Sequence, residues 1–221
     1  MAIMATATST DVGGAQALLG AELAAMTARG TARRQADRVA GQRAARRAVA
    51  SLTGWRREDF MVTRAPGGAP VVESTQGTVQ VSIAHRDGVG WAAATDRGRP
   101  GLDVEAVALR SGAWLRTWFT VAEQALVGDD PVAQTQVWCA KEAVLKALGT
   151  GMALHPREVE VVALGGASAQ LRLHGDAARC HARLGGGALR VSLGCVDGLV
   201  AAGALLSPGD GREAVASNRV A

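Results

Sequence analysis

Two stretches of the chain alternate apolar and polar residues on either side of an Asp-Gly pair. The first, TVQVSIAHRDGVGWAAAT, spans residues 78–95, and the second, ALRVSLGCVDGLVAAGAL, spans residues 188–205. Two β-type runs joined by Asp-Gly are typical of a tight hairpin, because both turn residues tolerate positive φ. The pattern therefore predicts two β-hairpins.

Two other stretches have helical character. The segment from Ala15 to Ser51 is rich in Ala, Leu, Arg and Gln, and we expect one or two helices there, closed by Thr53-Gly54. From Val137 to Leu148, apolar residues recur at helical spacing up to Gly149. This second pattern predicts an amphipathic helix with a glycine stop.

The two hairpins align with each other at a constant offset. Val81 and Val191, like Asp87 and Asp197, are 110 positions apart in a chain of 221. A fainter repeat matches AARRAV at 44–49 with CAKEAV at 139–144. We therefore predict an α+β fold with a pseudo-twofold arrangement of two similar subdomains, residues 15–102 and 103–206, and a cleft between them.

The two walls of such a cleft would carry different chemistry. In the alignment, His85 stands opposite Cys195, and Arg46-Arg47 stands opposite Lys141-Glu142. Clefts between subdomains are common ligand sites. One wall would thus present bases and acids that the other lacks.

The two ends of the chain have no periodic pattern. We expect residues 1–14 to be a disordered lead and residues 207–221 a disordered tail. The start has no basic region followed by an apolar run, and no segment approaches the length of a membrane span. Three cysteines without a CxxC pair read as free thiols. These features together predict a cytoplasmic protein with no membrane association.

Basic residues are unevenly distributed. The formal net charge is +4, and only two of the 24 basic residues are lysines, Lys141 and Lys146. Arginines crowd one early segment, which suits phosphate binding: Arg29, Arg33, Arg34, Arg38, Arg43, Arg46, Arg47, Arg56 and Arg57. A solvated helix face and a nucleic-acid patch are the alternative interpretations. An aromatic content of 3% argues against nucleic acid, because stacking platforms are scarce.

Two acid pairs are candidates for chemistry. In GLDVE, Asp103 and Glu105 would share one face of an extended segment, and a pair of carboxylates suits Mg²⁺ better than zinc. Glu142 and Lys146 are four apart on the predicted helix and project together. Each pair also has a simpler interpretation, a solvated strand end and a surface ion pair. His85, at a strand end, is the remaining candidate.

Five motifs in one order strengthen the functional interpretation. They are GGAP at 67–70, SIAH at 82–85, GLDVE at 101–105, WFTVAE at 118–123 and WCAKEAVLKALGTGM at 138–152. Together they resemble the surfactin-synthetase type of phosphopantetheinyl transferase, over roughly residues 29–161. The last motif is the most diagnostic, because that family has a W-x-x-K-E-x-x-x-K pattern followed by a glycine turn.

The resemblance implies an enzyme that moves the 4′-phosphopantetheine arm of coenzyme A to a serine of an acyl or peptidyl carrier protein. It implies Mg²⁺ held by Asp103, Glu105 and Glu142, with Glu142 and Lys146 catalytic. Residues implied at coenzyme A are Arg38, His85, Lys146, Arg47, Arg33, Arg34 and Arg86. WFTVAE would help to dock the carrier.

Two positions depart from the family pattern. Ala84 stands where a serine usually precedes the motif histidine, and Ala69 stands where a lysine often lies between glycine and proline. Arg86, in place of a small residue, is a candidate to replace the lost phosphate contact. A catalytically silent relative and, more distantly, a nucleic-acid-binding protein are the competing hypotheses. Because the cleft is built within one chain, we expect a monomer.

Overall fold

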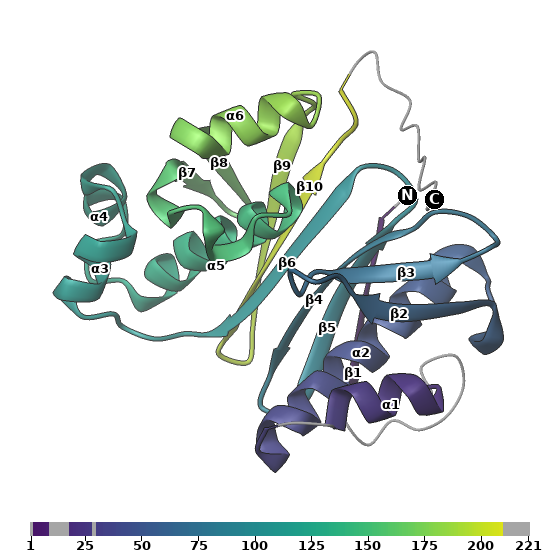
Figure 1. Ribbon diagram of the computed structural model, residues 1–221. Helices are drawn as coiled ribbons and strands as arrows, with labels where there is room; N and C mark the ends of the chain where they lie inside the picture. The colour runs from purple at the N-terminus through teal and green to yellow at the C-terminus, as the bar shows by residue number, and fades with distance from the viewer. Residues whose placement is uncertain (1, 9–17, 28–29, 210–221) are drawn as a thin grey trace.

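The computed structural model describes residues 2–8, 18–27 and 30–209, which form two α+β halves (Figure 1). The N-terminal half contains β1 (Ala2–Thr8), α1 (Gly20–Thr27), α2 (Ala32–Thr53), the 3₁₀ turn η2 (Arg57–Asp59), β2 (Phe60–Arg64), β3 (Pro70–Ser74), β4 (Gln80–Arg86) and β5 (Val89–Thr95). None of the helices within the described ranges is long and apolar enough to cross a membrane.

The C-terminal half repeats this order with additions. It contains β6 (Arg99–Ala106), α3 (Gly112–Trp118), α4 (Val121–Val127), α5 (Pro131–Leu148), η3 (Gly151–Ala153), η4 (Pro156–Glu158), β7 (Val159–Gly165), β8 (Ser168–Leu173), α6 (Gly175–Arg183), β9 (Leu189–Val196) and β10 (Leu199–Leu206). Each half thus runs strand, short helix, long helix, 3₁₀ turn and two hairpins. The predicted pseudo-twofold α+β architecture is confirmed.

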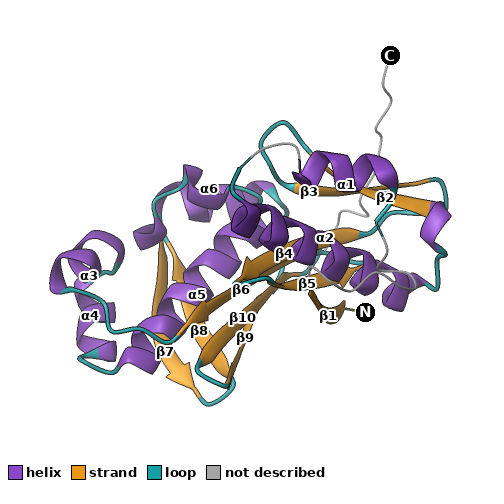
Figure 2. Cartoon of the chain, turned by 90° about the horizontal axis from the view of Figure 1, so that it is seen from below, coloured by secondary structure: helices purple, strands orange, loops and turns teal. Residues whose placement is uncertain are grey.

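The strands form three antiparallel sheets (Figure 2). One has the order β1-β5-β4, one the order β6-β10-β9-β8-β7, and β2 and β3 form a two-stranded ribbon. Helix α2 packs on the first sheet and α5 on the second. The halves meet where β4 lies beside β6, and there the Leu102 N–H donates to Ser82 Oγ at 3.0 Å.

Both predicted hairpins form, with matching turns. Asp87 and Asp197 each have φ of 50°, and the glycines that follow, Gly88 and Gly198, have φ of 78° and 74°. Positive φ at both central residues is the condition of a type I′ turn, which suits the twist of the flanking strands. The offset of 110 positions in the sequence therefore reflects a structural repeat.

The long helices end where the sequence predicted. Helix α2 stops at Gly54 and α5 at Gly149, both left-handed, with φ of 75° and 77°. Helix α5 begins earlier than its apolar periodicity indicated, because Asp130 caps its N-terminus and Pro131 occupies its first turn.

A buried ion pair fixes α2 to its surroundings. Glu22 on α1 pairs with Arg46 on α2, Nη1 to Oε1 at 2.9 Å, and the side chains are 1% and 0% exposed. The same carboxylate accepts backbone N–H groups of Leu19 and Val62, at 2.8 and 2.9 Å. Helix α1, helix α2 and strand β2 are thereby tied to one charged group.

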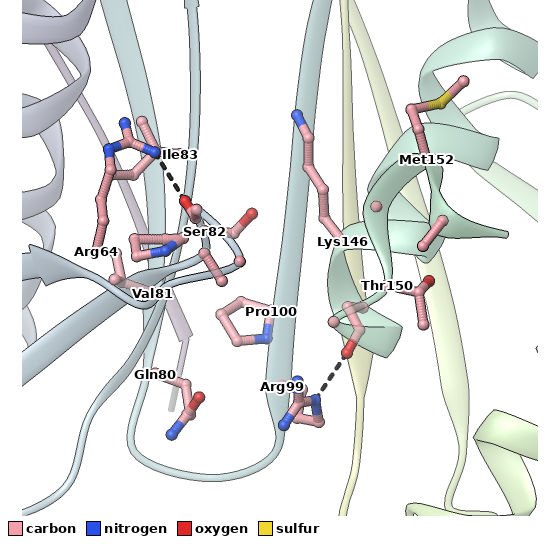
Figure 3. Close-up of a pocket in the computed structure, with 18 of the residues that line it drawn as sticks. Arg64, Gln80, Val81, Ser82, Ile83, Arg99, Pro100, Lys146, Thr150 and Met152 are labelled. Carbon is pink, nitrogen blue, oxygen red and sulfur yellow. Dashed lines mark hydrogen bonds between the residues drawn. The ribbon is translucent and has the colours of Figure 1, made fainter.

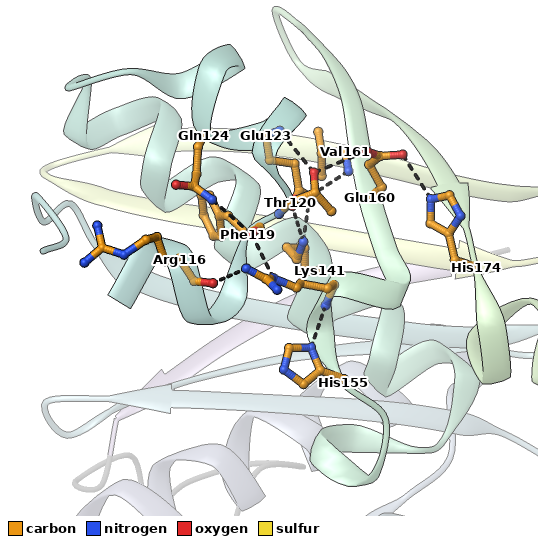
Figure 4. Close-up of polar contacts among 11 residues, drawn as sticks. Arg116, Phe119, Thr120, Glu123, Gln124, Lys141, His155, Glu160, Val161 and His174 are labelled. Atoms are coloured by element: carbon orange, nitrogen blue, oxygen red, sulfur yellow. Dashed lines mark hydrogen bonds and ion pairs between the residues drawn. The ribbon is translucent and has the colours of Figure 1, made fainter. Parts of the chain in front are cut away.

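The C-terminal half contains an equivalent buried ion pair (Figure 4). Glu123 on α4 pairs with Lys141 on α5 at 2.5 Å, with both side chains 0% exposed, and it accepts N–H groups of Thr120 and Val161 at 2.7 and 2.8 Å. Lys141 is the residue that the sequence alignment paired with Arg46. The repeat therefore extends from the hairpins to the polar core.

Two expected boundaries differ from the structure. Residues 2–8 of the predicted lead form β1, which pairs along its whole length with β5, from Ala2 with Thr95 to Thr8 with Val89. The boundary placed at residues 102 and 103 falls inside β6, which belongs wholly to the C-terminal sheet. The rest of the lead and residues 210–221 of the tail lie outside the described residues.

Candidate active site

Strand β6 and helix α5 bring the predicted acidic residues to the seam between the halves. Asp103 and Glu105 lie two apart on β6, and Asp103 is 8% exposed. Lys146 on α5 donates to Asp103 Oδ1 and to the Leu102 carbonyl, both at 2.8 Å. The lysine thus belongs to the site and not to a surface ion pair with Glu142.

Gly101 allows the strand and the helix to approach this closely. A Cβ at this position would lie 1.8 Å from the carbonyl oxygen of Ala143. Only glycine fits between the β6 backbone and α5. The glycine of the GLDVE motif therefore sets the spacing between the acids of β6 and Glu142 of α5.

Two carboxylate oxygens in the site have no partner in the described part of the chain. Asp103 Oδ2 and Glu142 Oε1 are buried and unbonded. The pKa of Glu142 is raised by burial and then by the charges of Asp103 and Glu105, against which Lys146 acts in the opposite direction. Buried, unpaired acceptors beside a second carboxylate fit a hard divalent cation.

Glu105, the third predicted ligand, is engaged elsewhere. Its Oε2 forms an ion pair with Arg86 Nη1. Burial and Asp103 raise the pKa of Glu105, whereas Arg86, Arg110 and a hydrogen bond from Trp138 lower it. Within the described ranges, no three His, Cys, Asp or Glu side chains are grouped closely enough to hold a metal. Asp103 and Glu142 thus each keep one oxygen without a partner among the described residues, while Glu105 is held by an arginine.

A cavity of about 520 Å³ is lined by Lys146, the partner of Asp103, although none of the three acids lines it (Figure 3). Arg64, Ser82 and Ile83 lie on one side, and Lys146, Thr150 and Met152 face them from α5 and the turn after it. The β2–β3 turn, including Ala69, forms part of the wall. The cavity is therefore shared between the two halves, as expected for a cleft of this fold.

Several cations gather at this cavity with few anions. Burial lowers the pKa of His85, and the charges of Arg64 and Lys146 add to this effect, while Asp37 opposes it. The pKa of Arg64 is lowered by burial and by Arg38. Groups that disfavour each other's positive charge are stabilised by an anionic ligand. The electrostatics therefore suit phosphate.

The structure brings only some of the predicted coenzyme A residues to this cavity. His85 and Lys146 line it, and Arg38 lies close enough to influence Arg64. Arg33 pairs with Asp87 at the hairpin turn, and Arg34 is exposed at the start of α2.

Arg47 faces a different part of the molecule. It donates to the Thr6 carbonyl at 3.1 Å and lines a separate cavity of about 910 Å³ together with Cys195. The register of α2, fixed by the buried Arg46, turns the next residue toward β1. Arg47 and His85, which were predicted to bind coenzyme A together, therefore line two different cavities.

Arg64 is a site residue that the sequence interpretation missed. It ends β2, directly before the β2–β3 turn, and donates to the Gly68 carbonyl at 2.9 Å. Its position just before the GGAP motif was the feature of the sequence that could have identified it. Arg64 supplies a positive charge on the wall where Ala69 has none.

Comparison with known proteins bears on this site. Residues 99–200 match the family model of the 4′-phosphopantetheinyl transferase superfamily. That segment contains Asp103, Glu105, Glu142 and Lys146, but it does not include His85 or the arginines of α2. This match thus lies within the C-terminal half.

Individual relatives agree with the family match. A holo-[acyl-carrier-protein] synthase of Desulfovibrio desulfuricans is 47% identical over 58 residues, which cover 25% of this chain and 47% of that protein. The chain thus spans about half the length of this curated relative.

Two solved structures are also similar. Helicobacter pylori holo-[acyl-carrier-protein] synthase in complex with coenzyme A has 18% identity and a TM-score of 0.43, covering 49% of this chain and 99% of that one. The acyl carrier protein synthase of Mycobacterium tuberculosis has 25% identity and a TM-score of 0.39, covering 51% and 98%.

Proposed function

We propose that this protein is a magnesium-dependent 4′-phosphopantetheinyl transferase of the surfactin-synthetase type. The observation that carries the proposal is the pair of buried, unpartnered oxygens on Asp103 and Glu142, beside Lys146 and a cation-rich cavity. The superfamily match over residues 99–200 supports it independently. Coenzyme A would be the donor substrate.

In this proposal each wall of the cleft has one task. His85 and Arg64, with Arg38 behind them, bind the 3′-phosphate side of coenzyme A. Asp103 and Glu142 would hold Mg²⁺, joined by Glu105 once it leaves Arg86. The bound ion would neutralise the pyrophosphate charge.

The residues of the chain then carry the proton and charge movements. Glu142, whose raised pKa makes it a better proton acceptor, takes the proton of the carrier serine. The serine oxygen bonds to the β-phosphorus as the bond from that phosphorus to the bridging oxygen breaks. Lys146 stabilises the negative charge on the departing 3′,5′-ADP.

The carrier partner follows from charge and exposed apolar surface. The chain carries a net charge of +4, which would attract the acidic surface of a carrier domain. Val121, 83% exposed, is an apolar residue of the WFTVAE motif. We infer that a carrier of fatty-acid, polyketide or nonribosomal-peptide synthesis docks at this motif. We also infer that the protein is a cytoplasmic monomer.

The test is intact-mass analysis of several apo carrier proteins incubated with the protein, coenzyme A and Mg²⁺. We expect one phosphopantetheine to be added by the wild type, and none by Glu142→Ala or in EDTA. If no carrier gains mass while coenzyme A still raises the melting temperature, the chain is a silent relative and the proposal is wrong.

A further inference from the structure

Arg86 lies between two acidic partners at the end of β4. Its Nη1 pairs with Glu105 Oε2, and its Nε is 3.6 Å from Asp87 Oδ2. The Arg86 side chain is 37% exposed and that of Glu105 is 26% exposed, whereas Asp87 is 60% exposed. One partner therefore belongs to the metal site and the other faces solvent.

The charges of the site are unequally compensated. Lys146 pairs with Asp103, and Arg86 pairs with Glu105. Glu142 forms no ion pair with any residue that the structure describes. For three carboxylates there are thus two side-chain cations in ion pairs, while the charge of Arg110 also acts on Glu105, and one of the paired cations occupies a predicted metal ligand.

An arginine on a metal ligand opposes the metal in two ways. It uses a carboxylate oxygen that the ion would need, and its charge repels a divalent cation. In the absence of metal the arginine stabilises the site, because its positive charge relieves the repulsion among the carboxylates. These two effects predict an exchange of one cation for another.

We propose that Arg86 is an internal competitor for the divalent cation, holding Glu105 in the metal-free protein and releasing it when the ion binds. The released guanidinium moves to Asp87, which its Nε already approaches. The position of Asp87 is held by the type I′ turn and by its ion pair with Arg33. This inference rests on the proposed function, since it concerns the same metal site.

The experiment measures Mn²⁺ binding to the full chain without coenzyme A, by following free Mn²⁺ with electron paramagnetic resonance. The Arg86→Gln substitution removes the competing charge and frees Glu105. We expect Mn²⁺ to bind about tenfold more tightly than to the wild type, the factor that a unit charge exerts on a nearby divalent ion in water-like surroundings.

Three further variants make the result specific. Arg179→Gln loses the same charge at an exposed ion pair with Asp176, outside the site, and its Mn²⁺ affinity should stay within about twofold of wild type. Arg86→Lys keeps the charge and should bind like wild type. Glu105→Gln should bind Mn²⁺ more weakly, and adding Arg86→Gln to it should give less than the tenfold gain, because the release of Glu105 no longer contributes.

Equal or weaker Mn²⁺ binding by Arg86→Gln, with a thermal melt that shows a folded protein, overturns the exchange. If Arg86→Gln does not fold, Arg86→Met decides in its place, because it also removes the charge and the exchange again predicts about tenfold tighter Mn²⁺ binding. Carrier modification is measured separately. A protein that modifies carriers but lacks the Mn²⁺ effect refutes the role of Arg86 alone, whereas one that shows the Mn²⁺ effect without carrier modification refutes the transferase proposal alone.

Discussion

The two halves of this chain share a scaffold and differ in what they present to the seam. In each half, a glutamate on a short helix is buried against a cation on the long helix, Glu22 with Arg46 and Glu123 with Lys141. In each, the glutamate also accepts a hydrogen bond from the third residue of the strand that follows, through the N–H of Val62 or Val161. The scaffold was thus kept in both copies.

The next residue along each long helix is different, Arg47 in one half and Glu142 in the other. The strands diverge in the same way. Asp103 pairs with Ala202, and its counterpart Ala5 pairs with Ala92, 110 positions earlier than Ala202. The acids of the candidate site therefore occur in one half only, and the fold by itself does not confer the chemistry.

The largest expected effect comes from replacing an acid that only the C-terminal half has. Glu142→Gln should lower carrier modification by about a thousandfold, because it removes both a metal ligand and the proton acceptor. Glu58→Gln, at an exposed carboxylate of the N-terminal half, is the matched control and should retain wild-type activity. Single-turnover mass spectrometry measures both, and retention of a tenth of the activity would contradict the assigned role.

A second pair of variants tests what the halves share. Arg46→Met and Lys141→Met each leave a buried glutamate without its cation, and each should lower the free energy of unfolding by about 3–5 kcal/mol. Urea denaturation measures the change. A loss below about 1 kcal/mol in either variant would show that the two ion pairs are not equivalent supports.

Two glycines provide a smaller and more selective comparison. A Cβ at Gly90 would lie 2.3 Å from the Ala40 carbonyl oxygen, and one at Gly101 would lie 1.8 Å from that of Ala143. Both alanine variants should lose about 1–3 kcal/mol of stability through overpacking. Only Gly101→Ala should also weaken Mn²⁺ binding, because only that glycine sets the spacing of the acids. Equal Mn²⁺ binding by both variants would refute the spacing argument.

The smallest effect concerns His85, which stands opposite Cys195 in the repeat. Burial, Arg64 and Lys146 hold its folded-state pKa below 6.5, so the unfolded chain binds the proton more readily. The His85 contribution is therefore present above pH 6.5 and is lost as the pH falls below it. Between pH 7.5 and 5.5, His85→Gln should lose less stability than the wild type in urea titrations, whereas parallel curves would exclude a lowered pKa of His85.

Local sequence signals predicted the parts of the fold that depend on local physics. Asp-Gly at 87–88 and 197–198 marked both turns, because positive φ restricts the residue choice there. Gly149 marked the end of α5 for the same reason. The spacing of Asp103 and Glu105 predicted one extended segment, and that of Glu142 and Lys146 one helix, and both pairs lie on those elements, β6 and α5.

Features that depend on distant partners were not predictable in this way. Strand β1 is composed of Ala, Ile, Met and Thr without charge, and only its pairing with β5 identifies it as a strand. Glu22 and Arg46 come from different helices, and no local pattern links them. Arg86 on Glu105 likewise joins two strands, so the sequence suggested a phosphate contact where the structure has an ion pair between these two side chains.

The link between β5 and β6 has a consequence for how the protein behaves in dilute solution. Only three residues, 96–98, separate the last strand of one half from the first strand of the other. Two separate subunits with the same cleft would part as their concentration fell, whereas a short covalent link keeps the walls at a high effective concentration. The specific activity should accordingly be the same at nanomolar and micromolar protein.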